Sequence, residues 1–133
     1  MKAISARTTA GCNIGTYMIA ADNSGAKVVK IVSVVRGKGT KGRQMRAKLA
    51  DWVKVSVKSG NPEMKGKVFD AVIIRQKKPF RRLTGERIAF EDNAVALLKD
   101  DKGNPKGTQI KGPIAKEIME RWAQVAKIAS IVY

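Results

Sequence analysis

Apolar and polar residues alternate along much of the first hundred positions, and this period of two is typical of β-strands. The pattern is clearest in 52–58, where three valines alternate with a tryptophan, a serine and two lysines. A strand with one apolar and one polar face belongs to an antiparallel sheet that is exposed on one side. Patterns of this kind predict strands at 17–21, 27–36, 52–58, 68–74, 87–90 and 94–98.

Two of these strands, 27–36 and 68–74, carry apolar side chains on both faces, and in the second only Asp70 is charged. We therefore expect both strands to be covered on both sides. Their β-branched content suits a pleated strand better than a helix. Residues that favour turns, chiefly Asp, Asn, Gly and Pro, separate the predicted strands at 22–25, 60–62, 84–86 and 100–105.

After Pro113, a residue that suits the first turn of a helix, the apolar period changes to that of a helix. The apolar residues that recur at this spacing are Ile114, Ile118, Trp122, Val125, Ala129 and Val132. We expect a helical tail over 113–133, formed by one or two short helices that pack on the sheet. Many short strands followed by such a tail favour a mainly β fold, a small antiparallel barrel in a single domain covering 1–133. Residues 1–16 are then an N-terminal arm.

The charge of the chain predicts a polyanionic partner. Its 133 residues include 27 Lys plus Arg against 11 Asp plus Glu, which gives a formal net charge of +16. Repulsion of this size opposes folding unless a partner neutralises it, and nucleic acid is the first candidate. An anionic membrane surface is the second, but no apolar run approaches the ~20 residues that would span a bilayer. The first residues lack the apolar core of a secretory signal, so we expect no membrane association and a cytosolic protein.

Two segments hold the cations that we assign to nucleic-acid binding. The basic loop, 36–48, contributes Arg36, Lys38, Lys41, Arg43, Arg46 and Lys48, which we call the loop group. The end of the predicted strand 68–74 contributes Arg75, Lys77, Lys78, Arg81 and Arg82, which we call the strand-end group. We predict that both groups neutralise phosphates of the nucleic-acid backbone. The alternative is a set of solvated charges that only keep the protein soluble.

The basic loop also contains a glycine pattern that must be weighed as a cofactor site. Gly37, Gly39 and Gly42 spell GxGxxG directly after a strand, as in a dinucleotide-binding turn. The next predicted strand is half exposed, however, and the connection is too short for the helix that such a fold requires. A phosphate-binding P-loop is excluded because Gly42 is followed by Arg43 and Gln44 rather than by Lys and Ser or Thr. We therefore expect no cofactor.

The residue types argue against an enzyme or a metal protein. The chain has no histidine and a single cysteine, Cys12, so it cannot form an internal disulfide or a Cys/His zinc site. The missing histidine also removes the usual general base near neutral pH. Glu91 and Asp92 are adjacent, and adjacent strand residues point to opposite faces, so we predict a turn that they share with Asn93. Cys12 is expected to be a buried or incidental thiol.

The aromatic residues do not favour recognition of single strands. Aromatic residues make up 5% of the chain, and the apolar neighbours of Trp52 and Trp122 predict that both rings belong to the core. Sequence-selective binding of single-stranded RNA relies on bases that stack on exposed aromatic rings. Backbone contacts to a folded RNA or a duplex are the better prediction.

Four segments carry a family resemblance. They are ADNSGA (21–26), AVIIRQKK (71–78), IAFEDNAVALL (88–98) and GTQIKGPIAKE (107–117). In this order, over about 17–121, they closely resemble the universal large-subunit ribosomal protein fourteen family. The arm, the basic loop and the tail are similar to those of its archaeal and eukaryotic branch and differ from the shorter bacterial pattern.

The resemblance implies a closed five-stranded barrel with C-terminal helices, in a structural constituent of the large ribosomal subunit. It implies binding to large-subunit rRNA, contacts with small-subunit rRNA across the subunit interface, and contacts with neighbouring ribosomal proteins. It also implies that an anti-association initiation factor docks on the C-terminal region, and that the protein resides in the cytoplasmic ribosome. From the residues alone, a nucleic-acid-binding module outside the ribosome remains an alternative, and an enzyme is the most remote one.

Overall fold

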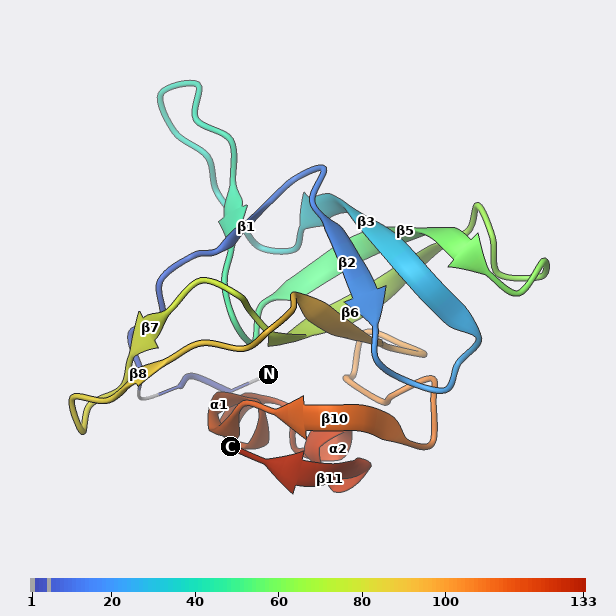
Figure 1. The fold of residues 1–133 in the computed structure, drawn as a ribbon. Helices are drawn as coiled ribbons and strands as arrows, with labels where there is room; N and C mark the ends of the chain where they lie inside the picture. The colour runs from blue at the N-terminus through green and yellow to red at the C-terminus, as the bar shows by residue number, and fades with distance from the viewer. Residues whose placement is uncertain (1, 5) are drawn as a thin grey trace.

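The centre of the protein is a small β-barrel. The computed structural model describes residues 2–4 and 6–133, so Met1 and Ser5 of the predicted arm lie outside the described residues. Within the described part, five strands close into the barrel (Figure 1): β2 (Tyr17–Ala20), β3 (Ala26–Val34), β5 (Trp52–Gly60), β6 (Val68–Arg75) and β9 (Ala94–Leu97). The prediction of a mainly β fold built on a small closed barrel is confirmed.

One pair of neighbouring strands departs from the predicted antiparallel arrangement. β2 runs parallel to β9, whereas the other four neighbouring pairs of the barrel are antiparallel. Strand directions cannot alternate all the way around a closed ring of five, so at least one pair must be parallel. The barrel is therefore mixed, and the alternation of apolar residues could not show where the parallel pair lies.

In the part of the chain that the structure describes, three smaller sheets flank the barrel. β1 (Cys12–Asn13) pairs with β4 (Arg46–Ala47), β7 (Phe80–Arg81) with β8 (Arg87–Ile88), and β10 (Ile110–Ile114) with β11 (Ala129–Val132). The first two pairs are antiparallel and the third is parallel. The predicted strand 87–90 is thus a two-residue strand outside the barrel, and the predicted turn at 84–86 connects it to β7.

The C-terminal segment is only partly helical. Two short helices among the described residues, α1 (Lys116–Arg121) and α2 (Ala123–Lys127), lie below the barrel in Figure 1, but β11 follows them and returns beside β10. The helical tail predicted over 113–133 is therefore corrected to helices over 116–127. Ile114 and Val132 share the helical spacing, yet they are partners in the β10–β11 ladder. A crossover through helices is the usual way to join two parallel strands.

The two strands predicted to be buried on both faces differ. In β6, Ala71, Val72, Ile73 and Ile74 are all buried, as predicted, whereas Val68 at its start is exposed. In β3 the second face is open, because Val32 is 46% exposed. A shift of register between Ile31 and Ser33 then moves the buried positions along the strand. Such a bulge cannot be read from a two-residue period.

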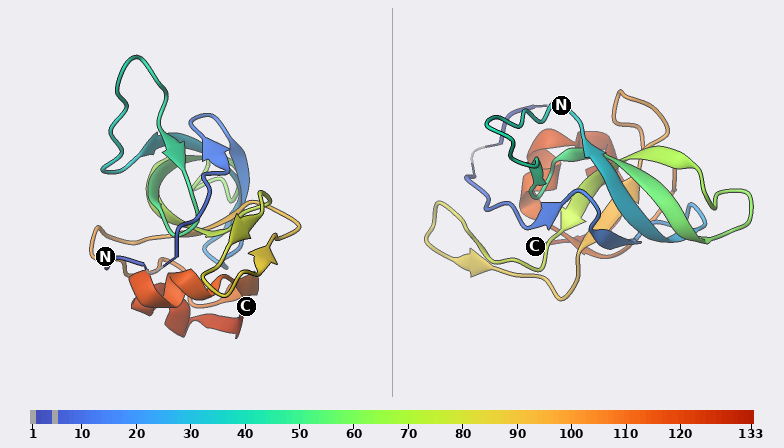
Figure 2. Two further views of the ribbon diagram at one scale, coloured as in Figure 1. Left: turned by 90° about the vertical axis from the view of Figure 1, so that its left-hand side faces the viewer. Right: turned by 90° about the horizontal axis from the view of Figure 1, so that it is seen from above.

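Both cationic segments leave the barrel at the same end. The end of β3 lies beside the start of β5 (Val34↔Val53), the start of β5 lies beside the second half of β6 (Trp52↔Val72), and the end of β6 lies beside the start of β9 (Arg75↔Ala94). The connections 35–51 and 76–93 therefore start beside each other, and the arm enters β2 at the same end. The left-hand view of Figure 2 looks onto this end, with the basic loop extending on one side and the β7–β8 hairpin on the other. None of the helices in the described residues is long and apolar enough to cross a membrane.

Candidate nucleic-acid interface

The basic loop is anchored at its base and extends freely beyond it. Cys12 pairs with Ala47 and Asn13 with Arg46, so the arm holds the returning half of the loop. At the tip the chain turns tightly, since a Cβ at Gly39 would lie 2.5 Å from the main-chain oxygen of Arg43. A glycine is needed there for the two halves of the loop to approach each other.

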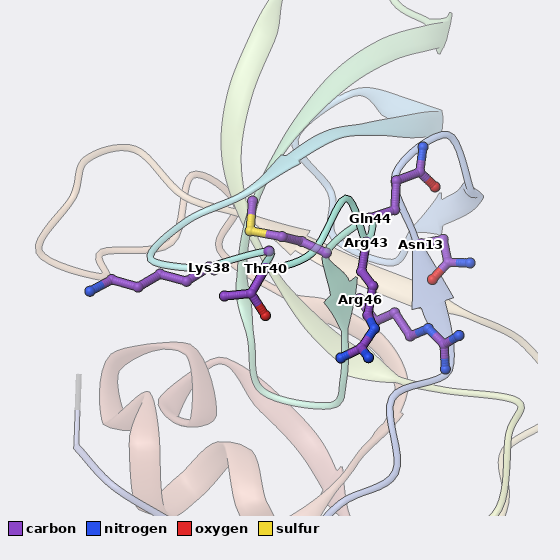
Figure 3. A pocket seen from close by; sticks show the side chains of 9 residues that line it. Asn13, Lys38, Thr40, Arg43, Gln44 and Arg46 are labelled. Atoms are coloured by element: carbon purple, nitrogen blue, oxygen red, sulfur yellow. The ribbon is translucent and has the colours of Figure 1, made fainter.

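The loop group is well placed for a polyanion. Five of its six cations are exposed, and the sixth, Lys48, is half-buried. Polar and basic side chains, including Asn13, Lys38 and Arg43, line a hollow of about 700 Å³ along the loop. In Figure 3, Lys38 points to one side of the loop, and the side chains of Arg43 and Arg46 lie on the other side near Asn13. Cations on both sides of an open loop can contact phosphates from more than one direction.

The glycines of this loop do not form a dinucleotide-binding turn. The connection 35–51 contains no helix among its residues, all of which the structure describes, and β3 and β5 on either side of it are antiparallel. A dinucleotide fold requires a helix that starts at the glycines and a following parallel strand. The interpretation of the glycines as part of a basic loop, not of a cofactor-binding turn, is therefore supported.

The end of the basic loop is fixed by Asp51. Its Oδ2 accepts a hydrogen bond from the main-chain N–H of Lys48 at 2.9 Å, and its Oδ1 accepts one from Arg121 Nη1 at 3.3 Å. Burial raises the pKa of the Asp51 carboxyl, while Lys48 and Arg121 act in the opposite direction. This carboxylate ties the loop to α1, a contact that could not be predicted because Arg121 is 70 residues away in the chain.

The strand-end group divides into two kinds of residue. Lys77, Lys78 and Arg81 are exposed, as the prediction requires. Arg75 and Arg82 instead form ion pairs inside the protein, with Asp92 and Glu117 respectively. The structure therefore brings three of the five predicted cations to the surface.

Arg75 is an internal structural residue. It is 7% exposed, and its Nε and Nη2 donate to the two carboxylate oxygens of Asp92 at 2.8 and 3.2 Å. Its Nη1 donates to the main-chain oxygens of Lys111 and Pro113, both at 2.9 Å. A guanidinium engaged in this way is not available to a phosphate, so Arg75 is removed from the predicted binding set. Asp92 does lie in a bend, but its ion pair was not predicted.

Arg87 was missed and joins the candidate interface. It lies directly opposite Arg81 in the β7–β8 ladder, and both side chains are exposed, whereas the neighbouring pair, Phe80 and Ile88, is buried. The signal was present in the sequence, because a hairpin turn around Gly85 places residues 81 and 87 opposite each other. The cation at 87 was instead attributed to a strand of the barrel.

A buried amide fixes the arm beside the strand-end group. Gln76 is fully buried, and its Nε2 donates to the main-chain oxygens of Thr9 at 2.7 Å and Lys78 at 3.0 Å. The arm passes so close that a Cβ at Gly11 would lie 2.9 Å from the Cβ of Lys78. The arm is therefore part of the same end of the barrel, and its contacts help to define where Lys77 and Lys78 lie.

The tryptophans belong to the packing of the protein. Their rings meet edge to face, with centroids 6.3 Å apart and planes at 80°. Trp122 is buried and its Nε1 donates to the main-chain oxygen of Ala50 at 2.8 Å. Trp122 is a core residue, as predicted, whereas Trp52 is half-buried and packs against the core.

Cys12 is buried, as predicted, and this changes its reactivity. Burial raises the pKa of the Cys12 thiol from 9.0 to about 11. At pH 8 we expect alkylation by iodoacetamide to be about a hundredfold slower than in the urea-unfolded chain, because the thiolate is the nucleophile. Equal rates in the two states would contradict the burial.

Because folding raises this pKa, the thiol favours the folded state below about pH 9, and this contribution is lost as the pH rises towards 11.

No group of three or more His, Cys, Asp or Glu side chains that could hold a metal ion occurs in residues 2–4 and 6–133.

Comparison with known proteins identifies the family of the chain. Residues 11–133 match the family described as ribosomal protein L14p/L23e. The chain is 58% identical to the large ribosomal subunit protein uL14 of Nanoarchaeum equitans over 132 residues, which is 99% of both chains. It is 50% identical to the protein of the same name from Methanothrix thermoacetophila and 46% identical to that from Halobacterium salinarum, again over 99% of each chain.

Proposed function

The chain belongs to the ribosomal protein L14p/L23e family, and from this premise we propose that it is a structural constituent of the large ribosomal subunit that binds large-subunit rRNA. The observation that carries the proposal is that exposed cations from two separate connections, 35–51 and 76–93, lie at the same end of the barrel. The family is one of structural proteins, so the protein is not an enzyme.

The proposed interface consists of nine exposed cations from two connections of the barrel. They are Arg36, Lys38, Lys41, Arg43 and Arg46 of the basic loop, and Lys77, Lys78, Arg81 and Arg87 of the second connection. Lys48, half-buried at the base of the loop, is a peripheral member. Cations of this kind bind by neutralising phosphates and releasing counterions, and they position a protein on folded RNA without reading its bases.

We extend the proposal to further partners in the ribosome. Contacts with small-subunit rRNA across the subunit interface and with neighbouring ribosomal proteins are proposed from the family resemblance. Docking of an anti-association initiation factor on the C-terminal region has the same basis. Exposed apolar side chains of that region, such as Met119, Ile131 and Tyr133, support a protein partner there.

Sedimentation of a cell lysate tests the proposal. We expect the protein to migrate with large ribosomal subunits in a sucrose gradient and to stay with them at high salt, as an integral subunit protein held by buried surface as well as by charge would do. Migration as a free protein, or with DNA, would contradict the proposal and favour a nucleic-acid-binding module outside the ribosome. Digestion of the lysate with DNase before sedimentation separates these two outcomes.

A further inference from the structure

Arg81, the last residue of β7, and Arg82, which follows it, lie in opposite environments. Arg81 is exposed, whereas the side chain of Arg82 is 11% exposed and that of its partner Glu117 is 4% exposed. Arg82 Nε donates to Glu117 Oε1 at 3.0 Å, and Nη2 donates to Oε2 at 3.3 Å. Nη2 also donates to the main-chain oxygen of Tyr133 at 2.5 Å. Arg82 therefore fastens the β7–β8 hairpin to α1 and to the residue after β11.

The hairpin needs such a fastening, because its own ladder is weak. β7 and β8 share two residue pairs, and an isolated hairpin of any length is at best marginally stable in water. One of the two pairs sets Arg81 opposite Arg87, and like charges directly opposite each other destabilise a ladder. The other pair, Phe80 and Ile88, is buried, and the Phe80 ring lies 5.6 Å from the guanidinium carbon of Arg82. Contacts outside the ladder must therefore hold the two strands together.

We propose that Arg82 and Glu117 are positioning residues, whose ion pair holds the β7–β8 hairpin so that Arg81 and Arg87 face an rRNA phosphate together. This inference rests on the proposed function. The two arginines are held side by side before RNA arrives, and a phosphate between them replaces their repulsion with charge-assisted hydrogen bonds. Holding the side chains in the bound arrangement in advance reduces the entropy that binding would otherwise cost.

The first test asks whether removal of the negative charge of Glu117 strengthens or weakens binding to RNA. Glu117→Gln removes a negative charge from a protein that binds a polyanion, so a purely electrostatic view predicts tighter binding. If Glu117 positions the hairpin, binding of deproteinised large-subunit rRNA weakens instead, by about three- to tenfold, the scale of disordering one or two long side chains. The matched control is Glu86→Gln, which removes an exposed carboxylate from the turn of the same hairpin and is expected to leave binding unchanged or slightly tighter.

The second test separates a positioning residue from a phosphate ligand. Arg81→Gln and Arg82→Gln each remove one positive charge from adjacent positions. We expect Arg81→Gln to lower the slope of log K against log salt by about one, as loss of a phosphate contact does. Arg82→Gln is expected to weaken binding with the slope unchanged. A slope that falls by about one in Arg82→Gln, or tighter binding by Glu117→Gln, would overturn the inference.

Hydrogen exchange in the free protein provides a readout that does not depend on RNA. The N–H of Arg82 bonds to Glu86 O and that of Gly85 bonds to Arg82 O, both at 2.9 Å, so their exchange rates report on the hairpin. We expect faster exchange of both amides in Glu117→Gln and no change in Glu86→Gln. Unchanged exchange in Glu117→Gln would overturn the inference even if wild-type protein binds rRNA. If the wild type shows no salt-dependent binding, the proposed function fails, and the exchange rates alone then decide whether the ion pair holds the hairpin.

Discussion

Replacing Lys38, Lys41, Arg43 and Arg46 together by Gln should weaken binding to large-subunit rRNA on the order of a thousandfold at about 0.1 M salt. All four side chains are exposed on the basic loop, so their loss leaves no buried group without a partner. For each phosphate contact that is lost, about one counterion fewer is released on binding, so the favourable entropy of that release is lost as well. The slope of log K against log salt should accordingly fall by about three to four. Filter binding at several salt concentrations measures both quantities.

The matched control for this variant lowers the net charge by the same amount at the opposite end of the barrel. Lys27, Lys58, Lys65 and Lys67 are exposed there, on β3, on β5 and around the turn into β6. Their replacement by Gln should change affinity much less, because they are remote from the proposed interface. Equal losses in the two variants would show that rRNA responds to the overall charge of +16 rather than to the basic loop.

The wild-type protein gives the reference for these slopes. With roughly six to ten phosphates engaged, affinity should fall about a thousandfold or more between 50 and 200 mM salt. The nine exposed cations of the proposed interface lie within this range. A flat salt response would rule out phosphate neutralisation as the mechanism, whatever the variants do.

The local part of the fold could be predicted from the sequence because its signals are local. Alternating residues in 52–58 and the turn at 84–86 are each specified by a few neighbours in the chain, and both are found as predicted. The strand β11 could not be found in this way. Ala129 and Val132 continue the helical spacing of Ile118 and Val125, and only the parallel partner β10, almost twenty residues earlier, makes them a strand.

The sequence allowed us to predict which segments carry the cations of the candidate site, but not which of these cations are exposed and free of a carboxylate partner. Arg81 and Arg82 are indistinguishable in the sequence, since both follow the same strand and have the same chemistry. What separates them is a carboxylate at Glu117, 35 residues from Arg82, which the packing of α1 brings to the hairpin. Conversely, Arg87 joins the site only through its register with Arg81. Electrostatic partners that are distant in sequence therefore decide which cations remain for RNA.

Arg75 is the clearest case, and its replacement by Met should lower the free energy of unfolding by about 3 kcal/mol, the lower end for breaking a buried ion pair. The lower end applies because the side chain of Asp92 is 30% exposed and can regain some hydration. Loss of the guanidinium also leaves the main-chain oxygens of Lys111 and Pro113 without this donor. The midpoint of thermal unfolding should fall by about 10 °C for a domain of this size.

The control for this prediction is Lys77→Met, which also removes one positive charge, but from an exposed residue two positions after Arg75. It should leave the midpoint of thermal unfolding within a degree or two of the wild-type value. The guanidinium of Arg75 is packed closely against Gly112: a Cβ at Gly112 would lie 2.9 Å from Arg75 Nη1, and the φ of Gly112 is +80°. This close packing explains why the site tolerates so little change. Arg75 thus joins β6 to β10 through a gap that only glycine leaves open. If Arg75→Met unfolds at the wild-type temperature but loses one unit of salt slope in rRNA binding, Arg75 returns to the phosphate-binding set. If it unfolds early and keeps its slope, its charge serves the fold and not the RNA.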